Sequence, residues 1–203
     1  MRTFSISCIM LMLITLICGC NKVPHEKSTD RLYKSVITQS CTYTNLLSTI
    51  QDSSAPLTKA SDNDGWATFS ELPINLQNHI IMYLEGDSLS DWDELQACRH
   101  IAEDNSLSEN EKASLIQGLS AGLALKSFVK DSMQTKGGES EAECRAIYYK
   151  KVKNILLGVV GATVGGAIAS KSVAGAIGAF VAASVLALDS IDNAGVEYVR
   201  CWA

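Results

Sequence analysis

Apolar residues recur at helical spacing along most of the chain. Between Arg31 and about Ile50 they share one face of a predicted helix, as the stripe Leu32, Val36, Tyr43, Leu47 and Ile50. A second amphipathic helix is predicted from Ser108 to about Gln134, with the core stripe Leu115, Leu119, Leu123 and Phe128. No segment alternates apolar and polar residues over the length of a strand. The pattern therefore predicts an all-α helical bundle.

Two capping boxes mark helix starts in the second half of the chain. Ser108 precedes Glu111 by three residues, and Ser140 precedes Glu143 in the same way. In such a pair the serine and the glutamate each satisfy a free backbone amide of the other. Gly137 and Gly138 lie between the two predicted helices and end the first of them.

The C-terminal third is nearly free of charge. Lys171 is the only formally charged residue between Ile155 and Leu188, which suggests two apolar helices joined by a short polar turn. Small residues share one face of each helix: Gly158, Gly161 and Gly165 on the first, Gly175 and Gly178 on the second. Small residues let two helix backbones approach closely, above all in lipid. The pattern resembles the glycine-zipper segments of several bacterial envelope lipoproteins.

The sequence leaves two environments open for this antiparallel Gly/Ala-rich hairpin. Tyr, Trp and Lys residues flank both arms, as they do at membrane interfaces. Each apolar arm has roughly 15 to 17 residues, however, below the ~20 that a membrane span usually needs. The hairpin is therefore expected either in a membrane or in a soluble core or oligomer contact.

The N-terminus carries an export pattern. An apolar run from Phe4 to Ile17 is too short to span a bilayer comfortably and ends in Cys18-Gly19-Cys20. This ending resembles a lipobox, which implies cleavage after Gly19 and lipid attachment to Cys20. Asn21 resembles the residue that follows the lipid-bearing cysteine in outer-membrane lipoproteins. An ordinary signal peptide or N-terminal anchor is the alternative.

Four of the seven cysteines remain if Cys8 and Cys18 leave with the signal peptide and Cys20 carries lipid. Two disulfides or four buried thiols fit this count. If Lys171 marks the hairpin tip, Cys144 and Cys201 lie at nearly equal height on two antiparallel helices. We therefore predict the disulfide Cys144–Cys201, which leaves Cys41 to pair with Cys98.

An apolar, Pro-started helix pattern begins at Leu72. Its stripe continues into the next predicted helix and consists of Leu72, Pro73, Leu76, Ile80, Ile81, Leu84, Leu89 and Leu95, followed by Cys98-Arg99. Pro suits a first helical turn, and the apolar spacing forms one face. The pattern resembles the F-box, a helical module that docks on the Skp-type adaptor of cullin–RING ubiquitin ligases. The resemblance implies that the stripe binds such an adaptor in a eukaryotic host. An ordinary amphipathic helical hairpin is the alternative.

Composition and motifs favour an interaction protein over an enzyme. The net charge of −5 argues against nucleic acid as a partner. No catalytic constellation, metal site or cofactor motif is found, and Ala60 replaces the first ligand in a segment that partly resembles a calcium loop. The leading prediction is a lipid-anchored adaptor-docking protein. The alternative is a structural outer-membrane lipoprotein whose hairpin inserts into the membrane or forms a homo-oligomer.

The predicted organisation follows these segments along the chain. It runs as signal peptide (1–19), tether (20–30), N-terminal helix and turn-rich loop (31–64), F-box-like segment (65–107), amphipathic helix (108–138) and glycine-rich hairpin with its flanks (139–203).

Overall fold

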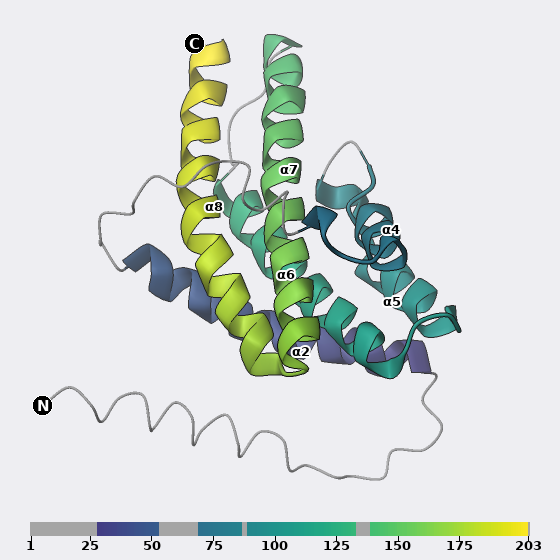
Figure 1. Ribbon diagram of the computed structural model, residues 1–203. Coiled ribbons are helices and arrows are strands. Elements are labelled where there is room, and N and C mark those ends of the chain that lie inside the picture. Colours follow the sequence, from purple (N-terminus) through teal and green to yellow (C-terminus); the bar gives the residue numbers. More distant parts are fainter. Residues whose placement is uncertain (1–27, 53–68, 87–88, 133–138, 203) are drawn as a thin grey trace, which may run out of the picture.

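The computed structural model describes residues 28–52, 69–86, 89–132 and 139–202 (Figure 1). The elements are α2 (Ser28–Asp52), α4 (Ile74–Tyr83), the 3₁₀ turn η1 (Leu89–Asp91), α5 (Glu94–Glu103), α6 (Glu109–Ser132), α7 (Glu139–Ser170) and α8 (Val173–Trp202). These ranges contain no strand, which confirms the all-α bundle. The lipobox, residues 20–27 of the predicted tether and most of the calcium-loop-like segment lie outside the described residues, whereas residues 28–30 of the predicted tether belong to α2.

Helix α2 begins three residues earlier than the sequence predicts, and Asp30 lies in its first turn, where a carboxylate favours the helix dipole. Three residues of the predicted stripe are buried, namely Val36, Tyr43 and Leu47, while Leu32 and Ile50 pack against the edge of the core. The stripe is therefore confirmed, and it forms the side of α2 that faces the core of the bundle.

Helix α6 is the centre of the bundle and contacts α2, α4, α5, α7 and α8. Its predicted capping box is confirmed: the Ser108 amide donates to Glu111 Oε2 (2.7 Å) and the Glu111 amide to Ser108 Oγ (3.3 Å). Leu115 and Leu119 of its predicted stripe are buried. Every residue from 114 to 122 is buried, so this stretch has no solvent face.

Two glycines bring other helices close to α6. A Cβ at Gly118 would lie 2.5 Å from Val164 Cγ2 of α7, and one at Gly122 would lie 2.7 Å from Tyr83 Cε1 of α4. Larger residues at these positions would push α7 and α4 away from the central helix.

Two buried polar contacts hold the outer helices on the core. Tyr43 of α2 donates to Gln117 Oε1 of α6 (2.9 Å), and its ring packs edge-on against Phe180 of α8 at 4.5 Å between centroids. Burial raises the pKa of Tyr43 above its ordinary value, so the hydroxyl keeps its proton and remains a donor. Trp92, just before α5, donates from Nε1 to the Tyr149 hydroxyl of α7 (2.9 Å).

A largely buried ion pair connects α5 and α6. Lys126 Nζ lies 2.8 Å from Glu94 Oε1 and also donates to the Trp92 carbonyl (2.7 Å). Glu94 accepts a further hydrogen bond from the Tyr83 hydroxyl (3.2 Å). Burial is the main cause that raises the pKa of Tyr83 well above its usual range, and the negative charge of Glu94 is the second cause. Each charged group has a partner, so the cluster leaves no unpaired charge in the core.

Candidate interaction surface

The hairpin turn lies where the sequence predicts it. Helix α7 ends at Ser170 and α8 starts at Val173, with Lys171 between them at a φ of 51°. This left-handed conformation reverses the chain within two residues. The Ser172 hydroxyl accepts from the Gly175 amide (3.2 Å) and so satisfies one free donor at the start of α8.

The backbones of α7 and α8 lie close together at Gly166 and Gly175. A Cβ at Gly166 would lie 2.6 Å from the Gly175 carbonyl oxygen, and one at Gly175 would lie 2.7 Å from the Gly166 carbonyl oxygen. Neither position has room for a side chain. The predicted packing role of Gly175 is therefore confirmed, but its neighbour Gly166 was not among the predicted residues.

Other predicted glycines do not form the contact between the two helices. A Cβ at Gly161 would meet Phe69 at 2.9 Å, so this glycine admits the segment before α4. A Cβ at Gly178 would meet no atom within 4 Å, so this glycine faces open space. Gly158 is buried and Gly165 half-buried. The expectation of one continuous glycine face is wrong because α7 packs on α4 and α6 as well as on α8.

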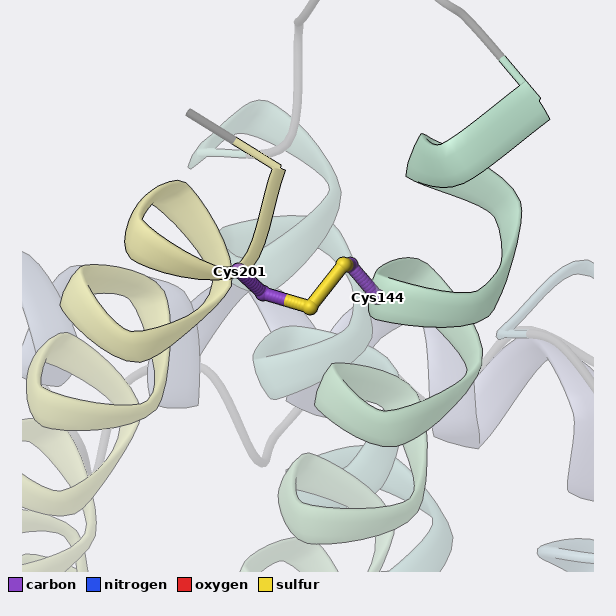
Figure 2. Close-up of a disulfide and its surroundings, with 2 residues drawn as sticks. All are labelled: Cys144 and Cys201. Carbon is purple, nitrogen blue, oxygen red and sulfur yellow. A yellow bond between two sulfur atoms is a disulfide. The ribbon is translucent and has the colours of Figure 1, made fainter.

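A disulfide joins the free ends of the hairpin. Cys144 of α7 and Cys201 of α8 are bonded, with 5.9 Å between their Cα atoms, and Figure 2 shows the two cysteines facing each other from the two helices. This bond confirms the predicted pair. Close to it, the rings of Tyr148 and Tyr198 lie 5.5 Å apart, and Lys151 forms an exposed ion pair with Glu197.

The second predicted disulfide is wrong. Cys41 and Cys98 are both free, because Cys41 lies on the exposed side of α2 whereas Cys98 lies on the buried side of α5. Burial, with added repulsion from Glu94 and Asp93, raises the pKa of Cys98 to about 12. Its thiol is therefore protonated at neutral pH and acts as a small apolar core residue.

The F-box-like stripe faces the protein's own core. Five of its eight residues are buried: Leu72, Leu76, Ile80, Leu84 and Leu89. Three are exposed to solvent, Pro73, Ile81 and Leu95. The expectation that the stripe is presented to a partner is wrong for the five buried residues. Helix α4 packs against α5, α6 and α7 of the same chain. These helices occupy the space that a partner would need.

A surface hollow of about 260 Å³ lies between α4 and α5, lined in part by His79, Met82, Glu85, Asp93, Gln96 and His100. Within the described ranges, no three His, Cys, Asp or Glu side chains converge as metal ligands would. His79 Nε2 instead lies 2.9 Å from Asp104 Oδ2.

Asp104 links α4 to the end of α5. Hydrogen bonds from the Ser106 hydroxyl and from His79 are the main causes that lower the pKa of Asp104 to about 2. The Ser106 amide donates to the same carboxylate at 2.8 Å. These contacts close the turn after α5, so their role is structural.

Helix α8 leaves an apolar face uncovered. We use the name α8 outer face for Ala174, Gly178, Ala182, Val185 and Asp189 of α8, together with Lys171 in the turn before the helix. All are exposed except Val185, which is half-buried. No charged residue lies between Ser172 and Asp189. The opposite side of α8 is buried, with Ala176, Phe180 and Ser184 in the core.

The two hairpin helices differ in how far the bundle covers them. By length and composition, Glu143–Ser170 and Val173–Cys201 are each long and apolar enough to cross a membrane. The bundle buries 61% of the apolar window in α7 but only 33% of that in α8. Helix α7 is therefore a core helix of the bundle, and the uncovered apolar surface of the hairpin belongs to α8.

In comparisons with known proteins, no family model, no curated protein and no solved structure matches the chain.

Proposed function

We propose that the protein is a non-enzymatic structural lipoprotein of the bacterial cell envelope, anchored by lipid on Cys20 and assembled through its C-terminal hairpin. The observation that carries the proposal is the contrast between the two hairpin helices. Helix α7 is buried in the bundle, whereas α8 keeps an uncharged apolar face in solvent. An uncovered face of this kind marks an interaction site in a folded protein.

The packing of α7 favours assembly over membrane insertion. Leu156, Val160 and Val164 of α7 are fully or almost fully buried. Moving the hairpin into lipid would remove α7 from α6 and expose the apolar surface of α6 to water, at a cost of about 25 cal/mol per Å². The disulfide would carry α8 along with α7. The lipid on Cys20 is therefore the proposed membrane anchor.

Docking of a Skp-type adaptor stays a prediction from the sequence. In the folded bundle it would require α4 to leave the core, because Leu76, Ile80 and Leu84 are almost completely buried. Such an opening would also break the contacts of Tyr83 with Glu94 and Trp92. The geometry therefore supports the structural function better.

Replacing the lipid-bearing cysteine tests the proposed anchor. In a Gram-negative expression host, Cys20→Ser is expected to move the protein from the membrane fraction to the soluble periplasmic fraction, because the lipid is the anchor and the hairpin is folded into the bundle. The matched control is Cys41→Ser, an exposed free thiol, which is expected to stay in membranes. Retention after a carbonate wash of a Cys20→Ser protein from which residues 1–19 have been cleaved would show that the hairpin itself is embedded.

A further inference from the structure

The α8 outer face is uncovered along about four helical turns. Ala174, Gly178 and Ala182 repeat every fourth residue and share one side of the helix. Figure 1 shows α8 at the edge of the bundle, alongside α7. With no atom within 4 Å of a Cβ at Gly178, another helix has room to approach the backbone closely there.

One charged residue lies at each end of this face, Lys171 in the turn before α8 and Asp189 within α8. The midpoint between Gly178 and Ala182 is also the midpoint between Lys171 and Asp189. Asp189 therefore lies about 14 Å along the helix from the centre, and Lys171 lies in the turn beyond the opposite end of the helix. Among the described residues, neither side chain forms an ion pair within one copy, and Asp189 accepts only a long hydrogen bond from Asn193 (3.4 Å).

We propose that the α8 outer face binds the α8 outer face of a second copy, antiparallel and about a two-fold axis. Gly178 then packs against Ala182 of the second copy, and Lys171 pairs with Asp189 of the second copy at both ends. A face that is complementary to itself in this way is what an isologous dimer requires. The inference rests on the proposed function, in which the hairpin assembles outside the lipid.

The charge pattern favours a second copy over a bilayer surface as the occupant. The antiparallel register turns both exposed charges into intermolecular pairs, whereas lying on a bilayer would bring the carboxylate of Asp189 to the edge of the acyl region, where it has no partner. Small residues such as Ala174 and Gly178 also bury little apolar area in lipid but allow close contact between two backbones.

The size of the face predicts a weak dimer in solution. A pair of helix faces buries less than the ~800 Å² per partner of a standard interface. Lipid anchors on both copies hold them at one membrane, which raises their effective concentration toward the millimolar range. The contact is therefore suited to proteins that share a membrane surface.

Charge reversal tests the register. The mature chain carrying Cys20→Ser is studied by sedimentation equilibrium at rising concentration, without detergent. We expect reversible dimers, and Asp189→Lys is expected to weaken dimerisation by about tenfold or more, because it places lysine against lysine at both ends. The double variant Lys171→Asp with Asp189→Lys is expected to restore it. Glu103→Lys makes the same charge change on exposed α5 and should have no effect.

Gly178→Leu tests the close approach independently of charge. The side chain has open space in one copy, so the helical circular dichroism and thermal midpoint should remain near those of the parent protein, while the dimer is lost. A parent protein that stays monomeric, or a dimer insensitive to Asp189→Lys and Gly178→Leu, would overturn the inference. Those outcomes leave the anchor experiment unaffected, whereas a cleaved Cys20→Ser protein retained in membranes would overturn the proposed function itself.

Discussion

Replacing both bonded cysteines, Cys144→Ala with Cys201→Ala, is expected to lower the free energy of unfolding by about 4 kcal/mol. The two residues are 57 apart in sequence, and a cross-link over a loop of this length strongly restricts the unfolded chain. Urea unfolding of the soluble protein, followed by circular dichroism, measures the difference. The free ends of α7 and α8 are expected to become the first part of the bundle to lose protection, since the bond joins them.

Two controls separate the bond from other cysteine effects. Cys41→Ser removes an exposed free thiol and is expected to leave the free energy of unfolding within about 0.5 kcal/mol of the parent value. Adding reductant should destabilise the parent protein but not the double variant. Equal stability of the parent and the double variant would mean that the bond does not restrain the chain.

Leu76→Ala is expected to lower the free energy of unfolding by about 3 kcal/mol, because it leaves a cavity where α4 meets the core. Leu76 is fully buried. Ile81→Ala, a matched change on the same helix, is expected to cost no more than about 0.5 kcal/mol, since that side chain is 48% exposed. Denaturant unfolding of both variants gives the comparison.

This pair of variants also distinguishes the two interpretations of the F-box-like stripe. A stripe held ready for a partner would make Leu76→Ala nearly neutral for folding and costly only for binding. If Leu76→Ala and Ile81→Ala lowered stability equally little, the placement of α4 against α6 would be wrong.

Features set by local pattern could be predicted from the sequence. The stripe of α2, the Ser108 capping box and the turn at Lys171 each depend on residues a few positions apart. The Cys144–Cys201 bond also follows, because the rise per residue fixes the height of each cysteine once the turn is known.

What covers an apolar face could not be predicted in this way. Periodicity shows that Leu76, Ile80 and Leu84 share a side of α4, but it does not say whether that side meets a partner or the same chain. The answer depends on α6, which is buried all round between residues 114 and 122 and offers α4 a close approach at Gly122. A long-range contact of this kind cannot be inferred from the spacing of the apolar residues in α4.

The packing glycines of α7 show a related limit. Gly165 and Gly166 are adjacent in sequence, yet one residue turns a helix by about 100°. Because α7 is apolar on nearly every side over 155–168, its sequence pattern does not fix which side faces α8. The structure assigns that contact to Gly166, opposite Gly175.

Amide hydrogen exchange tests most directly whether the hairpin belongs to the water-soluble bundle. The measurement uses the Cys20→Ser protein in buffer without detergent. We predict that the amides of residues 156–164 in α7 exchange as slowly as those of 115–125 in α6, because nearly every residue of both stretches is buried in one core. Rapid exchange at 156–164 beside a protected α6 would contradict the account, since it would show that α7 is not packed in the bundle outside a membrane.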